Sequence, residues 1–464
     1  MSHELTNLLY LITIVTFILA LRFLSNPATA RRGNWIGAAG MLLAIVVTFA
    51  QNDVVSYWEI AVGMVVGGSF GAVAARKVQM TAMPQMVALF NGVGGGAAAL
   101  IALAEFHNRA PDPGTLKTDI SASIMLSAII GSISFAGSMV AFAKLQELIR
   151  GRPIVYPLQQ PLNALLFLGL LAVGIAIAAG AEQQWLIWAL VAGSLLFGVL
   201  FVLPIGGADM PVVISLLNAF TGLAAAATGF ELENNVLIVS GMLVGASGTM
   251  LTILMGRAMN RSVANVLFGA FGQIAAPAAG TTAGPVDGQV RSASAEDVAV
   301  MLGYASKVVF VPGYGMAVAQ AQHDVRTLAD LLEARGVETS YAIHPVAGRM
   351  PGHMNVLLAE ANVPYPQLKE MEEANPEFAR TDVVLVIGAN DVVNPDARNN
   401  TGSPIYGMPI LNVDNAQQVV VLKRSMSPGF AGIDNPLFLN PKTVMLFGDA
   451  KESIERLMSS VKSL

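Results

Sequence analysis

The chain has 464 residues, of which 54% are hydrophobic and 12% are charged, and its mean hydropathy is +0.60. Since an average soluble domain is about 25% charged, this composition excludes a purely soluble protein and an intrinsically disordered one. The absence of cysteine excludes disulfides, a cysteine nucleophile and thiolate metal sites, and a net charge of -5 lacks the basic footprint of a nucleic-acid-binding protein.

The charged residues are unevenly distributed along the chain. Up to Arg261 there are 12 Lys and Arg against 11 Asp and Glu, whereas the rest of the chain has 14 against 20. We therefore predict a membrane domain over residues 1–260 and an acidic soluble domain over residues 298–464. Residues 261–297 are expected to be a linker, because residues 275–297 are rich in Ala, Gly, Pro, Ser and Thr and show no apolar period.

Nine apolar segments are long enough to cross a bilayer, which takes roughly 20 residues. The first has no basic residues before it and is too long for the apolar region of a signal peptide, so we expect it to be a retained span. The nine segments lie at about 5–24, 34–51, 56–75, 83–106, 121–143, 161–180, 185–204, 210–229 and 235–256.

Lys and Arg are concentrated in alternate connections between these segments. One set of connections holds ten of them, and the other set holds only Arg109 and Lys117. Because connections rich in Lys and Arg stay in the cytoplasm, we expect the N-terminus outside and the C-terminal domain in the cytoplasm.

Small and polar residues occur inside the apolar segments. Glycines recur every fourth residue at 63, 67 and 71 and again at 241 and 245, a spacing that lets helices pack closely in lipid. Buried polar side chains are costly in lipid and tend to mark transport pathways, here Asn91, Asn218 and Asp209. As alternatives, the asparagines could link helices by hydrogen bonds, and Asp209 could cap the helix that follows it.

Apolar strands alternate with helices in the soluble domain. We expect strands at 307–311, 340–343, 382–387, 408–411, 418–422 and 443–447. Helices are expected from the turn at 312–318 to about residue 335, within 353–375 and at 450–461. Strands that are apolar throughout indicate a parallel sheet covered on both faces. The predicted fold class is therefore a polytopic α-helical membrane domain with nine transmembrane helices, followed by a soluble α/β Rossmann-type domain.

A glycine-rich turn follows the first of these strands and opens a helix, as in dinucleotide-binding folds. In Gly313-Tyr-Gly315-Met-Ala-Val318 the glycines would let the backbone approach a pyrophosphate near a helix N-terminus. Val318 replaces the third glycine, so the motif is only moderately specific. A glycine turn without a ligand is the alternative.

The residues at two strand ends favour NADP(H) over NAD(H). An NAD site usually has an acidic residue at the end of the second strand, but here that strand ends at His344 without a carboxylate. Lys423, Arg424 and Ser425 end a later strand, and their cations and hydroxyl suit a 2′-phosphate. A solvated strand end is the alternative.

Four segments rich in glycine and polar side chains are expected at the carboxyl edge of the sheet, where open α/β sheets bind their ligands. They are residues 344–353, 388–392, 423–430 and 448–450. His344 and His353 could act as bases, but no carboxylate partner is evident, which favours a structural or substrate-contacting role. No metal site is expected.

Several long motifs resemble the β subunit of proton-translocating NAD(P) transhydrogenases. They are Gly-Gly-Ala-Asp209-Met-Pro, Val-Phe-Val-Pro-Gly313-Tyr-Gly, Ala-Ile-His344-Pro-Val-Ala-Gly-Arg-Met-Pro-Gly-His-Met-Asn, Gly388-Ala-Asn-Asp and Lys423-Arg-Ser. The resemblance covers the whole chain. It implies hydride transfer from NADH, held by a separate α subunit, to NADP⁺ held by this chain, coupled to inward proton movement. It further implies a bacterial inner membrane, and we expect a dimer of αβ units.

The resemblance and the glycine turn together predict which residues contact the nucleotide. The family binds NADP(H) in a reversed orientation on its sheet, which accounts for a cationic pair after a late strand, and residues 425–436 would form a lid. The expected contacts are Gly313, Tyr314, Gly315, Val318, Val346, Ala347, Gly348, Arg349, Met350, Pro351, Gly388, Ala389, Asn390, Asp391, Val392, Gly407, Met408, Lys423, Arg424, Ser425, Met426, Ser427, Pro428, Gly429, Phe430, Asp449 and Ala450.

The residues of this chain suggest further roles in such an enzyme. No general base is needed for hydride transfer, because the cofactor supplies that chemistry. We expect Asp391 to position the nicotinamide end or to sense its redox state, and Asp209 to link protonation to nucleotide occupancy. The proton path would be lined or packed by Asn91, Asn218, Ser247 and Gly248.

Two features of the chain depart from some members of the family. These relatives have a protonatable histidine where this chain has Asn91, and a tyrosine where it has Phe430. Two other functions remain open: a cation transporter with a regulatory nucleotide-binding domain, and a membrane-bound NADP-dependent dehydrogenase. The first should show an ion site or filter in the membrane and the second a catalytic set near the nicotinamide, and neither is evident.

Overall fold

The computed structural model describes residues 3–50, 57–78, 82–110, 117–150, 153–206, 209–259, 289–348, 352–403, 405–429 and 431–464. The chain divides into two compact units, one of membrane-type helices and one built around a sheet. Each unit is described by itself. The expected linker lies outside the described residues as far as residue 288.

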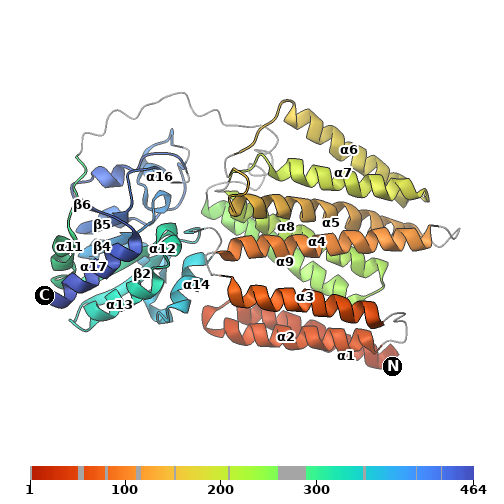
Figure 1. The fold of residues 1–464 in the computed structure, drawn as a ribbon, viewed down its shortest axis with the longest axis horizontal. Helices are drawn as coiled ribbons and strands as arrows, with labels where there is room; N and C mark the ends of the chain where they lie inside the picture. Colours follow the sequence, from red (N-terminus) through yellow and green to blue (C-terminus); the bar gives the residue numbers. More distant parts are fainter. Residues whose placement is uncertain are drawn as a thin grey trace. The chain divides into compact units, whose positions relative to one another are not determined.

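Among the described residues, nine helices are long and apolar enough to cross a membrane, which confirms the nine predicted spans (Figure 1). Each has 19 to 28 residues, enough for the hydrocarbon core of a bilayer. They are α1 (His3–Leu24), α2 (Pro27–Phe49), α3 (Tyr57–Lys77), α4 (Met83–Arg109), α5 (Thr118–Leu145), α6 (Gln159–Ala178), α7 (Gln184–Val202), α8 (Met210–Glu231) and α9 (Asn235–Ala258).

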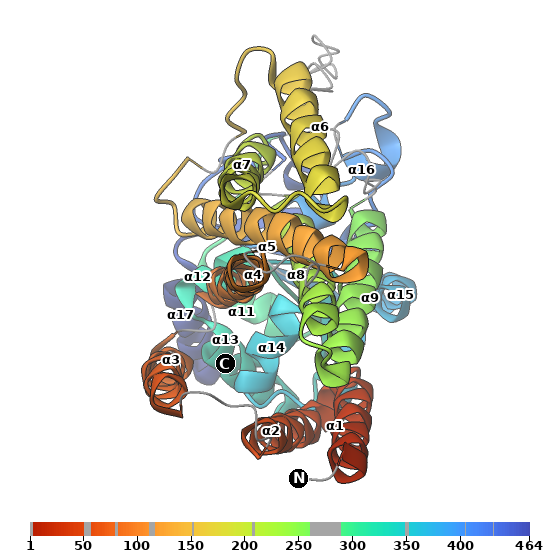
Figure 2. The ribbon, with the colours of Figure 1, turned by 90° about the vertical axis from the view of Figure 1, so that its right-hand side faces the viewer.

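Helix α5 is the most buried of the nine, because 72% of the residues in its apolar 18-residue stretch are buried inside the protein. Figures 1 and 2 show it with α7 on one side and α4 on the other. Helices α4 and α5 touch backbone to backbone, because a Cβ on Gly131 would lie 2.6 Å from the carbonyl oxygen of Gly95. Helices α8 and α9 meet in the same way, since a Cβ on Gly222 would lie 2.5 Å from the nitrogen of Gly245.

The two expected glycine stripes therefore differ in their surroundings. Gly241 and Gly245 of α9 pack against α8, as the close-packing interpretation predicted. By contrast, Cβ atoms built on Gly63, Gly67 and Gly71 of α3 would meet nothing within 4 Å among the described residues. Helix α3 also has no buried residue in the part of the chain that the structure describes.

The second unit contains a six-stranded sheet whose strands are all parallel, in the order β3-β2-β1-β4-β5-β6. This confirms the predicted Rossmann-type domain. The chain order reverses between β1 and β4, which makes their carboxyl ends the switch point where such sheets bind ligands. The strands are β1 (Lys307–Pro312), β2 (Glu338–Ile343), β3 (Leu368–Glu370), β4 (Val383–Ile387), β5 (Gln418–Lys423) and β6 (Thr443–Phe447).

Both faces of the sheet are covered, because successive strand residues point to opposite sides. One face carries Phe310 and Tyr341, which stack with ring centroids 5.2 Å apart, and is covered by α13 and α17. The other face carries Val309, Val384 and Val421 and packs on short helices. The helices of this unit are α11 (Ala295–Gly303), α12 (Tyr314–Ala319), α13 (Gln322–Glu333), α14 (His353–Glu360), α15 (Met371–Ala374), α16 (Asp396–Asn399) and α17 (Ala450–Ser463), with 3₁₀ helices η3 (Tyr365–Gln367), η4 (Asn375–Arg380), η5 (Asp391–Val393), η6 (Val413–Asn415) and η7 (Pro436–Leu439).

Three details differ from the sequence-based expectation. The helix after β1 is broken at Gln320, which has φ +51°, so α12 and α13 are separate. The strand expected at 408–411 was wrong, since the second of its residues, Pro409, has no N–H to donate to a strand partner. Strand β3 was missed because Leu-Lys-Glu is too short and too polar to show an apolar run.

Candidate functional site

Three glycines allow the turn after β1 to cross the loop after β4 at very short range. Gly313 donates its N–H to the carbonyl of Ile387 at 2.9 Å, and Gly315 donates to the carbonyl of Gly388 at 3.0 Å. A Cβ on Gly315 would lie 2.7 Å from the Cα of Gly388, and Gly388 itself has φ +65°. The glycines are therefore required for backbone packing at the switch point, whether or not a ligand is bound.

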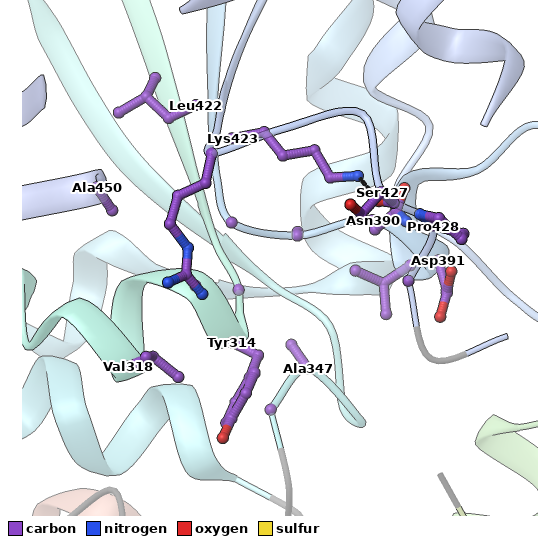
Figure 3. Close-up of a pocket in the computed structure, with 18 of the residues that line it drawn as sticks. Tyr314, Val318, Ala347, Asn390, Asp391, Leu422, Lys423, Ser427, Pro428 and Ala450 are labelled. Atoms are coloured by element: carbon purple, nitrogen blue, oxygen red, sulfur yellow. Dashed lines mark hydrogen bonds between the residues drawn. The ribbon is translucent and has the colours of Figure 1, made fainter. Parts of the chain in front are cut away.

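A cavity opens beside this crossing, at the carboxyl ends of the strands (Figure 3). The structure thus brings together the four segments that the sequence placed at this edge. Leu422, which lies outside those four segments, also lines the cavity, and so does Gly448 of the last segment. The expected residues that line the cavity are Gly313, Tyr314, Gly315, Val318, Val346, Ala347, Gly348, Gly388, Ala389, Asn390, Asp391, Val392, Met408, Lys423, Arg424, Ser425, Ser427, Pro428, Gly429, Asp449 and Ala450.

Of the six other expected contact residues, two do not line the cavity and four lie outside the described residues. Gly407 and Met426 are described but are not among its lining residues. The N–H of Gly407 instead donates to the carbonyl of Ala397 at 2.8 Å, and Met426 is exposed. The remaining four, Arg349, Met350, Pro351 and Phe430, lie outside the described residues.

Asp391 joins the loop after β4 to the segment after β5. Its carboxylate accepts a hydrogen bond from the N–H of Ala431 at 2.9 Å. Gly429 lies directly against it, because a Cβ there would be 2.5 Å from an Asp391 carboxylate oxygen. Farther along, Asn435 donates from its side-chain amide to the carbonyl of Asn390 at 3.0 Å. The segment expected to be a lid is therefore fastened to the loop after β4 at two points.

Lys423 and Arg424 have different surroundings, although they are adjacent in sequence. The Lys423 ammonium donates to the carbonyl of Ser427 (Figure 3). It also lies over the ring of Phe438, 5.1 Å from its centroid. Burial lowers the pKa of Lys423, while nearby Asp391 and Asp434 oppose that shift. Arg424 is exposed. Lys423 thus supports the segment after β5, and Arg424 is the cation of this pair that faces solvent.

His344 is held in one tautomer by the hydrogen bonds of its two ring nitrogens. Its Nε2 lies 2.8 Å from the carbonyl oxygen of Pro409, to which it must donate, and its Nδ1 accepts the N–H of Val346 at 3.2 Å. Burial lowers the pKa of His344, so the ring is held neutral. Its role is therefore to connect the 346–348 loop to the segment at Pro409, in line with the structural alternative.

His353 begins α14 and packs against the same loop. It is almost fully buried, and Gly348 has φ +103°. A Cβ on Gly348 would lie 2.4 Å from the Nδ1 of His353, so this position accepts only glycine.

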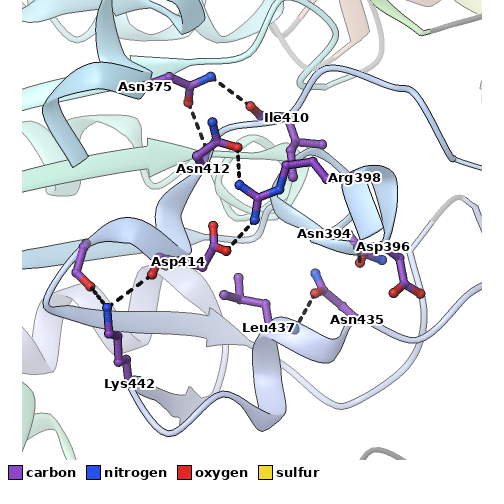
Figure 4. A network of polar contacts seen from close by, with 11 residues as sticks. Asn375, Asn394, Asp396, Arg398, Ile410, Asn412, Asp414, Asn435, Leu437 and Lys442 are labelled. Atoms are coloured by element: carbon purple, nitrogen blue, oxygen red, sulfur yellow. Dashed lines mark hydrogen bonds and ion pairs between the residues drawn. The ribbon is translucent and has the colours of Figure 1, made fainter. Parts of the chain in front are cut away.

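A polar network holds the segment that carries Met408 against the rest of the domain (Figure 4). Asn375 donates to the carbonyl of Ile410 at 3.1 Å and accepts the N–H of Asn412 at 2.9 Å. Arg398 donates to the side-chain oxygen of Asn412 at 2.7 Å and forms an ion pair with Asp414. The segment lacks strand pairing, and these bonds satisfy its backbone instead.

Asp449 directly precedes the last helix, α17, at the edge of the cavity. Its side chain caps α17 by accepting the N–H of Lys451 at 3.0 Å. An acceptor at this position satisfies one of the free N–H groups of the helix terminus.

The polar residues expected in the membrane path fall into separate places. Asn91 donates from its side-chain amide to Ser138 at 2.9 Å, and Gly248 packs on α8 at Ala219. Ser247 is exposed, and its hydroxyl donates to the carbonyl of Val244 in its own helix. Asn218 and Asp209 are half-buried, the latter directly before α8. The helix-linking alternative thus describes the contacts of Asn91.

The sequence analysis missed one buried carboxyl group, that of Glu231 at the end of α8. Its side chain is fully buried and accepts a hydrogen bond from the hydroxyl of Ser127 on α5. The signal was an acidic residue inside the last turn of an apolar span, which is costly in a membrane.

The comparisons with known proteins agree with this architecture over the whole chain. The sequence model of the family described as NAD(P) transhydrogenase beta subunit matches residues 6–460. Two curated proteins named NAD(P) transhydrogenase subunit beta, from Rhodospirillum rubrum and from a strain of the same species, are each 50% identical over 466 residues, covering 99% of this chain and 100% of their own length. The chain belongs to the NAD(P) transhydrogenase beta subunit family.

Proposed function

We propose that this chain is the NADP(H)-binding, proton-translocating subunit of a transhydrogenase. In this proposal a partner α subunit holds NADH, and hydride passes from it to NADP⁺ held by this chain, with inward proton movement. The cavity at the switch point of the sheet is the observation that carries the proposal, because family membership alone implies only that a nicotinamide nucleotide is involved.

The residues at the cavity fit a phosphorylated dinucleotide. The glycine crossing at Gly313, Gly315 and Gly388 brings the backbones of two loops together at the cavity, where a pyrophosphate would approach them. Arg424 supplies a planar, exposed cation for a 2′-phosphate, and the residues that follow it add the hydroxyls of Ser425 and Ser427, which lie 2.9 Å apart. When bound, the nicotinamide supplies the hydride chemistry. The chain itself binds and orients the nucleotide, and it excludes water from the site.

Residues 425–436 would act as the lid over the nucleotide. Support comes from the hydrogen bond between Asp391 and Ala431 and from the one between Asn435 and Asn390. Asp391 would then position the nicotinamide end. Because its carboxylate also holds the lid, Asp391 is suited to report the state of the nucleotide to that segment.

Coupling requires two conformations that differ in proton access and in NADP(H) affinity. We assign the link between them to Asp209, which directly precedes α8. Asn91, Asn218, Ser247 and Gly248 would line or pack the proton path. One proton moving through 100 mV supplies about 2.3 kcal/mol, which is enough to favour NADPH formation several-fold.

The remaining elements of the proposal concern organisation and location. Residues 1–260 would form the membrane domain, 261–297 the linker and 298–464 the nucleotide domain. The protein would lie in a bacterial inner membrane, with its N-terminus outside and its nucleotide domain in the cytoplasm.

An α subunit is proposed as the partner, and two αβ units would form a dimer. The word "beta" in the names of the relatives supports a partner subunit. Helix α3 also supports a partner subunit, because no described residue packs against the face that carries its glycines.

One reaction tests the whole proposal. Membranes that contain this chain with its α partner should reduce an NAD analogue with NADPH, and membranes that contain this chain alone should not. Turnover without the partner would contradict the proposal, because this chain would then hold both nucleotides or act on another substrate.

A further inference from the structure

The carboxyl group of Glu231 is buried inside the membrane unit with little compensation for a negative charge. The residue has an exposed fraction of 0%. One carboxyl oxygen accepts from Ser127, and the other has no hydrogen-bond partner among the described residues. An ionised carboxylate in such a place is costly, so the group is suited to hold a proton.

The charged groups that act on Glu231 among the described residues both belong to α4. Arg109 is engaged by Glu105, with Nε and Oε2 2.7 Å apart. Arg109 also donates to the backbone carbonyl of Glu231 at 3.4 Å. From α5 the contact is the neutral Ser127, and α9 starts beyond Glu231 at Asn235. The carboxyl group of Glu231 thus has one cation nearby, and that cation is shared with a second carboxylate.

A line of buried and half-buried polar side chains runs along α5 and α8 from Glu231 towards the middle of the bundle. One helical turn before Glu231 lies Thr228, whose exposed fraction is 3% and whose hydroxyl has no partner among the described residues. Two turns farther, Thr221 lies 2.5 Å from the hydroxyl of Ser134. Ser127 and Ser134 are seven residues apart on α5, or roughly 10 Å along the helix axis.

The line ends at Asn91 of α4. Its amide nitrogen donates to Ser138 at 2.9 Å, while its amide oxygen is buried with no partner among the described residues. Buried polar atoms of this kind are usually satisfied by internal water. Such atoms on α4 and α8 offer hydrogen-bond partners to internal water, and protons can pass between water molecules linked in this way.

We propose that Glu231 is a proton-binding site, and that the polar line through Thr228, Thr221 and Asn91 carries protons between it and the centre of the bundle. This inference rests on the proposed function and adds the group that takes up the proton. Asn91 cannot titrate, so a path through it needs a titratable group elsewhere. Glu231 supplies that group from α8.

Glu231→Gln separates this role from a structural one, because a glutamine keeps the acceptor for Ser127 but cannot release a proton. We expect the variant in the αβ complex, reconstituted in liposomes, to translocate protons at least tenfold more slowly, with NADPH affinity within twofold of the wild type. Glu233→Gln, an exposed carboxylate two residues away, is the matched control and should keep both properties. If Glu231→Gln translocated protons at the wild-type rate at every pH tested, the inference would be overturned.

An infrared titration of the chain alone tests the same group without nucleotide or partner. The carbonyl band of a protonated carboxylic acid should titrate in the wild type and in Glu233→Gln, and it should be absent from Glu231→Gln. If Glu231→Gln does not accumulate, Ser127→Ala should shift that band by removing its hydrogen bond. A band that is unchanged in these variants would overturn the inference. If the band behaves as expected but the αβ complex transfers no hydride, the proposed function fails while Glu231 remains a proton site.

Discussion

The carboxylate of Asp391 accepts the backbone N–H of Ala431 at 2.9 Å, so the loop after β4 and the segment after β5 are joined at the edge of the sheet. The two residues are 40 positions apart in the sequence. This bond is one of the two points at which the segment after β5 is fastened to the loop after β4.

Asp391→Ala should release that segment. A hydrogen bond to a charged group contributes about 1.5–3 kcal/mol, so the amide of Ala431 should lose roughly tenfold or more of its protection from hydrogen exchange. NADPH binding to the full chain should weaken by a similar factor. Asp434→Ala is the control, because its exposed carboxylate lies in the same segment and its backbone carbonyl, which accepts from Asn394, is retained. Equal effects of the two substitutions would argue against the role of the Asp391 bond.

Gly388→Ala should disrupt the crossing beneath the cavity. The new Cβ would lie 2.3 Å from the Cα of Gly315, in a residue with φ +65°. Gly336→Ala shares the unfavourable φ, at +87°, but its Cβ meets nothing within 4 Å, so the pair isolates the steric effect. We expect Gly388→Ala to cost about 1–3 kcal/mol more than Gly336→Ala, seen as faster amide exchange in β1 and β4 of the full chain. Similar exchange in the two variants would contradict the close approach.

His344 should make the nucleotide domain sensitive to acid. Burial lowers its pKa below the unfolded value of 6.5, so the folded state favours the neutral ring. The unfolded state therefore binds more protons as pH falls below 6.5, and stability is lost until the folded-state pKa is passed. The protection factor of the Val346 amide, which corrects for the intrinsic pH dependence of exchange, should fall as the pH is lowered from 7.5 to 5.5, and His344→Asn should remove much of that fall. His323→Asn, on the exposed side of α13, should leave it in place.

Arg424→Gln should reduce the preference for the phosphorylated nucleotide. Loss of a charge-assisted contact of about 1.5–3 kcal/mol would weaken NADPH binding by at least tenfold and leave any weak NADH binding unchanged. Arg456→Gln removes an equally charged but remote side chain of α17, whose exposed fraction is 69%, and serves as the control. A parallel loss for both nucleotides in Arg424→Gln would place the cation away from the 2′-phosphate.

The main elements of the fold could be predicted because they depend on composition and period. In the part of the chain that the structure describes, the nine apolar runs of adequate length form nine helices, and the continuous apolar strands form a parallel sheet. The segment around Pro409 could not be predicted correctly, because its backbone is satisfied by contacts such as those of His344 and Asn375, which come from other parts of the chain.

The candidate site was predictable in its location but not in its contacts. Strand ends and glycines indicated which segments meet, since parallel strands share one carboxyl edge. The orientation of Lys423 towards Ser427 and Phe438 could not be deduced from a Lys-Arg pair. Nor could the contact between Glu231 and Ser127, which are 104 residues apart.

Calorimetric titration of the purified full chain with NADPH and with NADH, at the same pH and salt concentration, tests the central claim most directly. We predict that NADPH binds at one site per chain at least a hundredfold more tightly than NADH. NADH binding with equal or higher affinity at that site would contradict the account.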